Sequence, residues 1–170
     1  MMLSKLGFNH WFKSQASELC VSGKSIARVT AVDRNQLIVR NELGELPAEL
    51  AGRFFYSSKS PSDLPCVGDW VGVRYHDGGA HATINHRLPR KSSLRRKNPG
   101  KIIEFQMIAA NIDVAFIVQS CHYDFNLQRL ERYLVMVSEG QIEPVILLTK
   151  TDLVSLEERE KMIEGIRQVG

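Results

Sequence analysis

The chain has 170 residues, of which 44% are hydrophobic and 24% are charged, as is typical of a soluble globular protein. This length fits one ordinary domain or two small ones. No apolar run is long enough to span a bilayer and no signal-peptide pattern follows Lys5, so we exclude membrane-spanning, collagen-like and disordered classes and expect a cytoplasmic location. The cysteines Cys20, Cys66 and Cys121 form no CxxC pair, which predicts reduced thiols.

Charge is distributed unevenly along the chain, although the net charge is only +3. Residues 1–103 contain 16 basic and 8 acidic side chains, whereas residues 104–170 contain 6 basic and 11 acidic ones. The two parts therefore carry +8 and −5, and no Asp or Glu occurs between Ala80 and Ile103. This asymmetry predicts two modules, the first of which faces a polyanion.

The first half of the chain has the pattern of short strands separated by turns. Near its start, Phe8, Trp11 and Phe12 predict an apolar plug. Strand-forming residues then predict five strands, at Ile26–Val32, Leu37–Arg40, Leu46–Tyr56, Trp70–Tyr75 and Ala80–Leu88. Five short strands at close spacing, without a convincing long helix, predict a small closed barrel.

The segment Asp77-Gly78-Gly79 is a strong hairpin turn between the last two predicted strands. His76 and His81 flank this turn and would face each other across the hairpin. Two ligands do not make a metal site, so we predict none there.

The second half alternates between buried strands and amphipathic helices. Ile112–Val118 is nearly continuous apolar sequence, which is typical of a strand covered on both faces. A helix follows, with Asp124 or Asn126 as its N-cap. A second buried strand at Val145–Leu148 and a capping-box pattern that begins at Ser155 predict a β–α–β–α unit with parallel strands.

Two parallel strands and two helices leave apolar sheet surface and two strand edges uncovered. A domain with these strands normally runs to about 150 residues or more. We therefore expect that the chain is a fragment of a longer protein, or that a partner completes the sheet.

The most informative motif is Thr149-Lys150-Thr151-Asp152, at the carboxyl end of the second buried strand, where open α/β sheets bind ligands. A carboxylate there can accept two hydrogen bonds from the N1–H and N2–H₂ groups of guanine, a donor pair that adenine lacks. The Lys150 stem can lie along the base plane. From these residues alone, an ordinary strand end with Asp152 capping the next helix stays open as the alternative.

The segment Gly23-Lys24-Ser25 has the ending of a phosphate loop but not its beginning. Glu18 stands where the pattern GxxxxGKS requires its first glycine, and a carboxylate there would repel phosphate. We interpret this segment as a turn before a strand. The chain therefore has a candidate base-recognition element and no phosphate-binding element.

The second signal is the basic stretch His86–Lys101, in which Arg and Lys lie among Ser, Asn and Gly. Guanidinium groups match phosphate oxygens and lysines add charge, which favours nucleic-acid binding, with a solvated interdomain linker as the alternative. The candidate RNA-binding residues are Arg87, Arg90, Lys91, Arg95, Arg96, Lys97 and Lys101. The aromatic candidates for base stacking are Phe54, Phe55, Tyr56, Trp70 and Tyr75.

Several segments, in their order and spacing, resemble the ribosome small-subunit-dependent GTPase A family, also called RsgA, YjeQ or EngC. These are the predicted barrel followed by LPRKSSLRRK, AANIDVAFIVQS, DFNLQRLERYL and EPVILLTKTDL. The resemblance covers residues 22–155 and implies an OB-fold barrel followed by the first βαβα part of a circularly permuted P-loop GTPase domain. Because the permutation places the guanine motif before the phosphate loop, it accounts for a chain with TKTD and without GxxxxGKS.

The resemblance also implies how the chain is divided. Residues 1–21 form an N-terminal extension, residues 22–89 the OB-fold RNA-binding domain, residues 90–105 a basic linker, and residues 106–170 the incomplete start of the GTPase domain.

The implied activity is that of a GTPase assisting late maturation of the small (30S) ribosomal subunit. The resemblance implies that the barrel and the linker dock on ribosomal RNA, that the GTPase domain binds GTP with Mg²⁺, and that contact with the RNA stimulates GTP hydrolysis. The resemblance assigns guanine binding to Thr149, Lys150 and Asp152, with Thr149 in a position where the family usually has Asn.

In the family, the phosphate loop, the catalytic elements and a Zn²⁺ site belong to other parts of the protein. We therefore predict no catalytic and no metal-ligating residue in this chain and expect it to be inactive alone. The expected partners are the small subunit with its rRNA and a guanine nucleotide, without a membrane, and we expect a monomer. The alternative is a non-enzymatic RNA-binding module whose βαβα unit is a docking surface.

Overall fold

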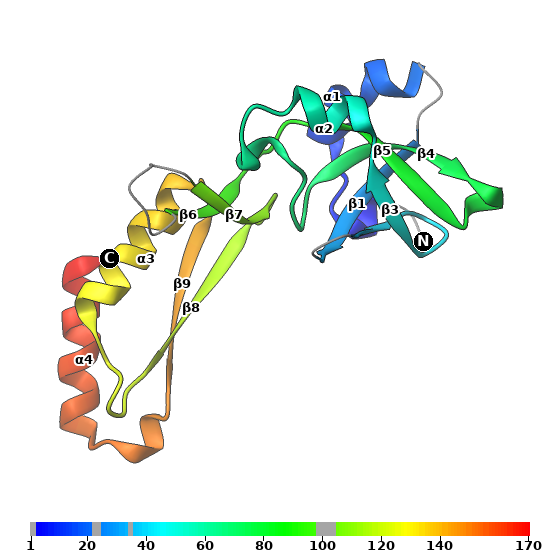
Figure 1. Ribbon diagram of the computed structural model, residues 1–170. Helices are drawn as coiled ribbons and strands as arrows, with labels where there is room; N and C mark the ends of the chain where they lie inside the picture. The colour runs from blue at the N-terminus through cyan, green and yellow to red at the C-terminus, as the bar shows by residue number, and fades with distance from the viewer. Residues whose placement is uncertain (1–2, 22–24, 34–35, 98–104) are drawn as a thin grey trace. The chain divides into compact units, whose positions relative to one another are not determined.

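A computed structural model of the chain describes residues 3–21, 25–33, 36–97 and 105–170 (Figure 1). The chain divides into two compact units, unit 1 (Met1–Asn111) and unit 2 (Ile112–Gly170). In the described ranges, no helix combines the length and the apolar character that a membrane crossing requires. The segment Gly23-Lys24 of the rejected phosphate-loop pattern lies outside these ranges.

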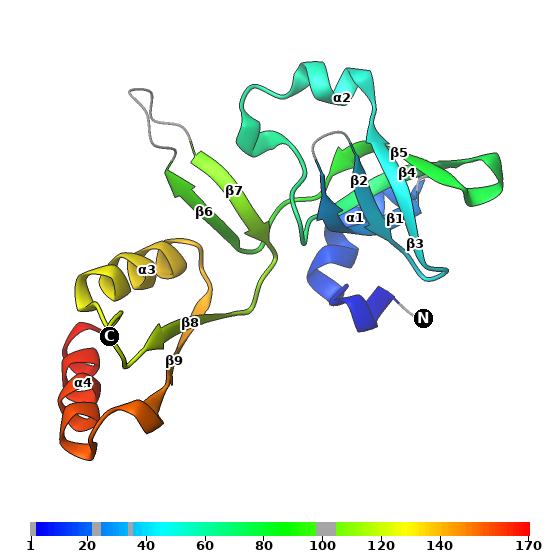
Figure 2. The same cartoon turned by 60° about the horizontal axis from the view of Figure 1, so that its bottom comes forward.

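Unit 1 is built around a closed five-stranded barrel, which confirms the predicted barrel. Its strands are β1 (Ser25–Val32), β2 (Leu37–Arg40), β3 (Glu45–Leu50), β4 (Trp70–His76) and β5 (His81–Arg87). They follow the order β1-β2-β3-β5-β4, with β4 pairing back to β1 (Figure 2). Strands β3 and β5 pair in parallel and the other neighbours are antiparallel. Closure gives every barrel strand two neighbours, so no strand edge is left open.

The barrel core follows from the alternation of side chains along the strands. On β4, Val71 and Val73 are fully buried and Tyr75 packs against them, whereas Arg74 points to solvent. The buried cluster consists of Ala27, Val29, Val39, Leu46, Ala48, Val71, Val73, Ala82 and Ile84. These side chains are mostly small or β-branched, which suits the narrow interior of a five-stranded barrel.

A 3-10 turn (η1, Leu3–Leu6) and the helix α1 (His10–Val21) precede the barrel. Phe8 and Phe12 pack on the fully buried Trp70, with ring centroids 4.8 and 5.9 Å from the indole. This confirms the apolar plug for Phe8 and Phe12, while Trp11 stays partly exposed. The helix α1 was not predicted, because its sequence shows only weak amphipathic periodicity.

The third barrel strand is shorter than predicted. The sequence indicates a strand over Leu46–Tyr56, but β3 ends at Leu50 and the helix α2 (Gly52–Ser57) follows. The chain turns at Ala51, whose backbone N–H donates to the carbonyl of Ile84 in β5. Phe54 then packs against the barrel core. The prediction was wrong here because a run of aromatic residues also suits a short helix that covers a barrel.

Two further strands belong to unit 1, the antiparallel pair β6 (Ser93–Lys97) and β7 (Phe105–Ala110). Strand β6 lies inside residues 90–105, which the sequence analysis describes as a linker. At the end of β7, the N–H of Ala110 donates to Val67 and the Asn111 amide donates to Gly68. Gly68 has a φ of +91°, and a Cβ there would lie 2.0 Å from the Ala110 carbonyl oxygen. This close approach, which only glycine permits, ties β7 to the barrel.

Unit 2 has the predicted β–α–β–α order. It consists of β8 (Val114–Ser120), α3 (Leu127–Glu139), β9 (Glu143–Thr149), the 3-10 turn η4 (Thr151–Leu153) and α4 (Leu156–Val169). Strands β8 and β9 pair in parallel, as predicted. Asn126 caps α3 by accepting a hydrogen bond from the Arg129 N–H, and Ser155 opens α4 with a complete capping box.

The sheet of unit 2 is covered on one face only. On the inner face, Ile117 and Gln119 of β8 are buried, together with Leu130 of α3. On the outer face, Phe116 is 66% exposed and Val118 is 60% exposed. The prediction that β8 is covered on both faces is therefore wrong for this chain, whereas the expected uncovered apolar sheet surface is present.

Candidate functional site

The motif Thr149-Lys150-Thr151-Asp152 lies at the carboxyl end of β9, beside the carboxyl end of β8. Thr149 is held by the neighbouring strand, because its hydroxyl donates to the Gln119 carbonyl at 3.3 Å and its own carbonyl accepts from the Cys121 N–H at 3.0 Å. The Thr149 hydroxyl is therefore directed to the backbone of β8. Of the three predicted guanine-binding residues, Lys150 and Asp152 are exposed at this edge and are not held by β8.

Lys150 and Asp152 are presented by a tight turn. Lys150 adopts a left-handed conformation with φ 56° and ψ 35°, and its carbonyl accepts the N–H of Leu153 at 3.2 Å. Asp152 is exposed in η4 and makes no hydrogen bond or ion pair with any residue that the structure describes. The capping role that the alternative interpretation gives to Asp152 is performed by Ser155. A carboxylate held at a strand end without an internal partner can accept hydrogen bonds from a ligand.

A polar network that the sequence analysis missed fixes the end of β8 beside this turn. The buried amide of Gln119 donates to the Asn126 carbonyl at 3.2 Å and accepts from Arg129 at 3.1 Å. Arg129 also holds the Asp124 carboxylate through contacts of 2.9 and 3.0 Å. The Arg129 guanidinium, with a smaller contribution from Lys150, keeps the pKa of Asp124 below its usual range. A Gln inside an apolar strand pattern was the available signal for this network.

The predicted RNA-binding residues fall into two groups, of which the first is exposed. Arg95, Arg96 and Lys97 lie on β6 and point to solvent, and Lys91 is exposed just before the strand. The Arg95 guanidinium lies over the Phe105 ring of β7 at 4.4 Å, and Arg96 donates to Gln106 at 3.0 Å. These contacts orient the cations on one strand pair without neutralising their charge. Lys101 lies outside the described residues.

Arg90 belongs to the second group, because its side chain is only 12% exposed. Its guanidinium binds both oxygens of the fully buried Asp69 at 2.8 and 2.7 Å. Two further N–H groups donate to the carbonyls of Ser62 and Leu64. Burial raises the pKa of the adjacent Cys66 thiol to about 12, and the Asp69 carboxylate contributes to this rise. Arg90 thus joins the 61–66 segment to the barrel and uses most of its donors within the protein.

Arg87 is likewise part of the internal structure. Its Nε donates to the Asp63 carbonyl at 3.2 Å, and one Nη donates to the Leu88 carbonyl at 3.2 Å. The two arginines nearest the barrel therefore position loops, whereas the cations of β6 face solvent.

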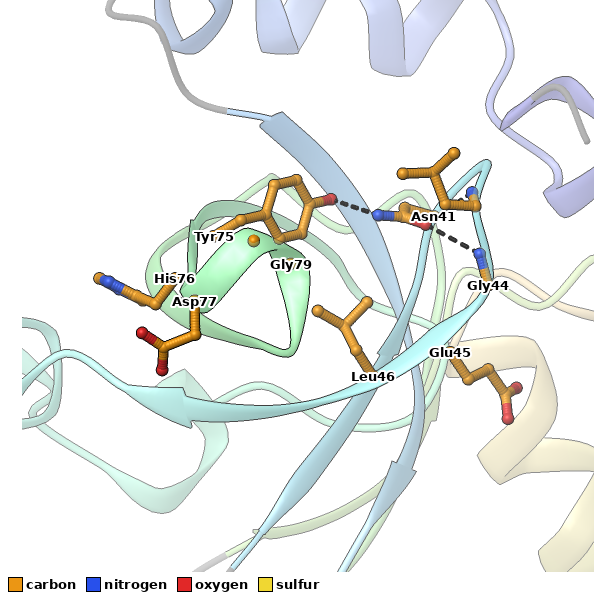
Figure 3. A pocket seen from close by; sticks show the side chains of 10 residues that line it. Asn41, Gly44, Glu45, Leu46, Tyr75, His76, Asp77 and Gly79 are labelled. Atoms are coloured by element: carbon orange, nitrogen blue, oxygen red, sulfur yellow. Dashed lines mark hydrogen bonds between the residues drawn. The ribbon is translucent and has the colours of Figure 1, made fainter.

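A separate pocket lies at one end of the barrel, with a volume of about 420 Å³ (Figure 3). Asn41 donates to the Tyr75 hydroxyl at 2.7 Å and accepts from the Gly44 N–H at 3.0 Å, so its amide is used within the protein. The predicted facing of His76 and His81 is confirmed, since their rings stack at 5.0 Å. Tyr75, one of the aromatic candidates for base stacking, lines this pocket, whereas the predicted guanine-binding residues and basic RNA-binding residues do not. In the part of the chain that the structure describes, no group of three or more His, Cys, Asp or Glu side chains could hold a metal ion.

Comparison with known families gives a match over residues 87–170 to the model of the RsgA GTPase family. Proteins with RsgA names are 32–44% identical to most of the chain. The chain belongs to the RsgA GTPase family. The family match includes β6 and β7 of unit 1 together with all of unit 2.

Two RsgA relatives illustrate the extent of the likeness. The small ribosomal subunit biogenesis GTPase RsgA 1 of Listeria innocua is 44% identical over 154 residues, covering 91% of this chain and 41% of the relative. The RsgA protein of Opitutus terrae is 32% identical over 161 residues, covering 90% of this chain and 44% of the relative. The chain thus spans about two fifths of the length of these RsgA proteins.

Two solved structures share the fold. YjeQ from Thermotoga maritima aligns with a TM-score of 0.63 at 22% identity, over 83% of this chain and 46% of the other. YloQ, described as a circularly permuted GTPase, aligns with a TM-score of 0.59 at 22% identity, over 85% of this chain and 47% of the other. A barrel followed by part of a circularly permuted GTPase fold, as the sequence predicts, is therefore confirmed.

Proposed function

We propose that the chain is part of a GTPase that assists late maturation of the small ribosomal subunit, in which unit 1 binds ribosomal RNA and unit 2 reads the guanine base. The observation that carries this proposal is the Asp152 carboxylate at the carboxyl end of β9, which has no partner among the described residues, in a chain of the RsgA family. A strand end of this kind is where open α/β sheets bind ligands. The relatives' names supply the expected process and reaction.

The chemistry of guanine recognition assigns a different task to each residue of the motif. Asp152 accepts two hydrogen bonds from guanine N1–H and N2–H₂, which excludes adenine because it would leave the carboxylate unpaired. The aliphatic stem of Lys150 covers one face of the base while its ammonium stays in water. Thr149 contributes by holding β9 to β8 through its hydrogen bond to Gln119.

Exchange of Asp152 for Asn in a protein of the relatives' full length tests this assignment. Asn presents an N–H donor where xanthine has a carbonyl oxygen in place of the guanine amine, so D152N should bind GDP weakly and XDP tightly. The measurement is competition of GDP and XDP for the protein. An unchanged preference for GDP would show that Asp152 does not contact the base.

RNA binding by unit 1 is supported by the four exposed cations Lys91, Arg95, Arg96 and Lys97. We infer that these residues contact phosphates, while Arg87 and Arg90 position the loops beside them. Replacing Arg95, Arg96 and Lys97 by Ala should weaken binding to rRNA and lower the slope of log K against log salt by roughly 0.7–0.9 for each lost phosphate contact. An unchanged slope would refute the role of β6.

We propose magnesium and zinc binding only for a protein of the relatives' full length. GTP binding in this family implies Mg²⁺ at the phosphates, but the residues that the structure describes form no cluster of ligands for either ion. We therefore assign the base to Lys150 and Asp152, and we assign no phosphate or metal to the residues that the structure describes.

A further inference from the structure

An adjacent pair of aromatic side chains lies exposed on α2. Phe55 is 52% exposed and Tyr56 is 87% exposed, and their rings meet edge to face with centroids 5.8 Å apart. Figure 2 shows α2 as a short turn outside the barrel wall, after β3. Single exposed apolar residues are common on protein surfaces, but two neighbouring aromatic rings form a contiguous apolar surface that is costly to leave in water.

The position of the pair is fixed by the residues before it. Ala51 donates to Ile84 of β5, and Phe54 packs against the barrel core. Because an α-helix has about 3.6 residues per turn, directing Phe54 of α2 inward turns the next two side chains away from the barrel. An aromatic ring has two side-chain torsions, so holding it in place costs little conformational entropy.

The charges next to the pair are positive. Arg53 and Lys59 are exposed, and neither forms an ion pair with a residue that the structure describes. No acidic residue occurs from Leu50 to Ser62. The next carboxylate, Asp63, accepts hydrogen bonds from the N–H groups of Lys59 and Ser60 at 3.0 Å. The surface therefore combines exposed aromatic rings with cations.

This combination matches the chemistry of an unpaired nucleotide. Bases stack on aromatic side chains, and neighbouring cations bind the phosphates of the same strand. Apolar docking of a protein would need a larger contiguous apolar patch than two rings. We infer that Phe55 and Tyr56 form a stacking platform for one or two unpaired bases of RNA, with Arg53 and Lys59 contacting the adjoining phosphates. This inference rests on the proposed function, in which unit 1 binds RNA.

The test compares two RNAs on the 170-residue chain, one with an unpaired loop and one fully paired. The double variant F55A/Y56A should lose about 5- to 100-fold in affinity for the loop RNA, the range expected for the loss of base stacking. Its salt slope should stay that of the unsubstituted chain, because stacking releases no counterions. Affinity for the duplex should not change. Y56F keeps the ring and should bind like the unsubstituted chain.

Two controls separate stacking from other effects. L43A removes an exposed apolar side chain elsewhere in unit 1 and should leave binding to both RNAs unchanged. The Ala variant of Arg95, Arg96 and Lys97 should lower the salt slope for both RNAs. The exposed positions of Phe55 and Tyr56 mean that F55A/Y56A should keep the melting temperature of the unsubstituted chain.

The outcomes distinguish this inference from the proposed function. If the unsubstituted chain binds neither RNA, both are overturned. If it binds and F55A/Y56A binds equally well, only the stacking platform is overturned. If F55A/Y56A binds both RNAs normally but loses affinity for intact small subunits, the pair docks on a protein and the inference is overturned. Selective loss of loop-RNA binding with an unchanged slope supports it.

Discussion

The two units of the chain differ in how completely their strands are covered. In unit 1, five strands close on one another around a buried core, and α1 with Trp70 covers one part of the barrel. In unit 2, two strands pair with each other, and their outer face leaves Phe116 and Val118 exposed. Every barrel strand of unit 1 therefore has two neighbouring strands, whereas unit 2 leaves one sheet face and one strand end accessible to a ligand or partner.

The same contrast applies to charge within unit 1. The basic residues that precede β6 are drawn into the fold, because Arg90 neutralises the buried Asp69 and Arg87 holds neighbouring carbonyls. The basic residues of β6 remain at the surface. A run of like charges in a sequence can therefore combine structural and ligand-binding roles, which only the partners of each side chain separate.

Loss of the buried ion pair should have the largest effect on unit 1. D69A removes the partner of Arg90 and two hydrogen-bond acceptors, so it should lower the free energy of unfolding by about 3–5 kcal/mol. Both tryptophans lie in unit 1, so denaturant unfolding followed by Trp fluorescence reports this unit. D77A removes an exposed partner of His81 and should cost at most about 1 kcal/mol. Equal effects of D69A and D77A would contradict the structural role of the pair.

The two faces of β8 should respond differently to truncation. I117A removes a buried side chain and should cost about 2–5 kcal/mol in the stability of unit 2. F116A removes a larger side chain from the exposed face and should stay within about 0.5 kcal/mol. The measurement is thermal unfolding followed by helix ellipticity, with α3 and α4 reporting unit 2. A large loss in F116A would mean that the outer face is covered in solution.

Gly68 tests how β7 is joined to the barrel. G68A places a methyl group 2.0 Å from the Ala110 carbonyl oxygen at a φ of +91°, so it should cost at least about 2 kcal/mol. G78A also has a positive φ, of +66°, but meets no atom within 4 Å, and should cost about 1 kcal/mol. Comparison of the two unfolding midpoints isolates the contribution of the contact. Equal unfolding midpoints would show that the close approach of Gly68 to Ala110 does not join β7 to the barrel.

The Cys66 thiol gives unit 1 a dependence on alkaline pH. Because burial raises the pKa of this thiol from 9.0 to about 12, the unfolded chain loses the proton at lower pH than the folded chain. Stability is complete below pH 9 and should fall as the pH rises from 9 towards 12. C66A should show a flatter decline over this range in pH-dependent unfolding. Identical profiles for C66A and the unsubstituted chain would mean that the Cys66 thiol of the folded chain is in contact with water.

Much of the fold could be predicted because its local signals agree. The alternation of Val71, Val73 and Tyr75 in β4, the turn after His76 and the capping box at Ser155 each indicate one local structure, and all three are present. The helix α2 could not be predicted, because the direction of Phe54 depends on the distant barrel core. The motif at Lys150 and Asp152 could be predicted as a strand end. That Asp152 has no partner in the described part of the chain, and that Arg90 is used internally, depend on tertiary contacts.

The most direct test of the comparison between the units is a double titration of the 170-residue chain with a labelled rRNA segment and a fluorescent GDP analogue. The account predicts salt-dependent RNA binding through unit 1, with a slope that the Ala variant of Arg95, Arg96 and Lys97 lowers. It predicts no submicromolar GDP binding, since the chain offers residues for the base but not the amide cradle and Lys that hold the phosphates. Submicromolar GDP affinity, or RNA binding that ignores salt, would contradict it.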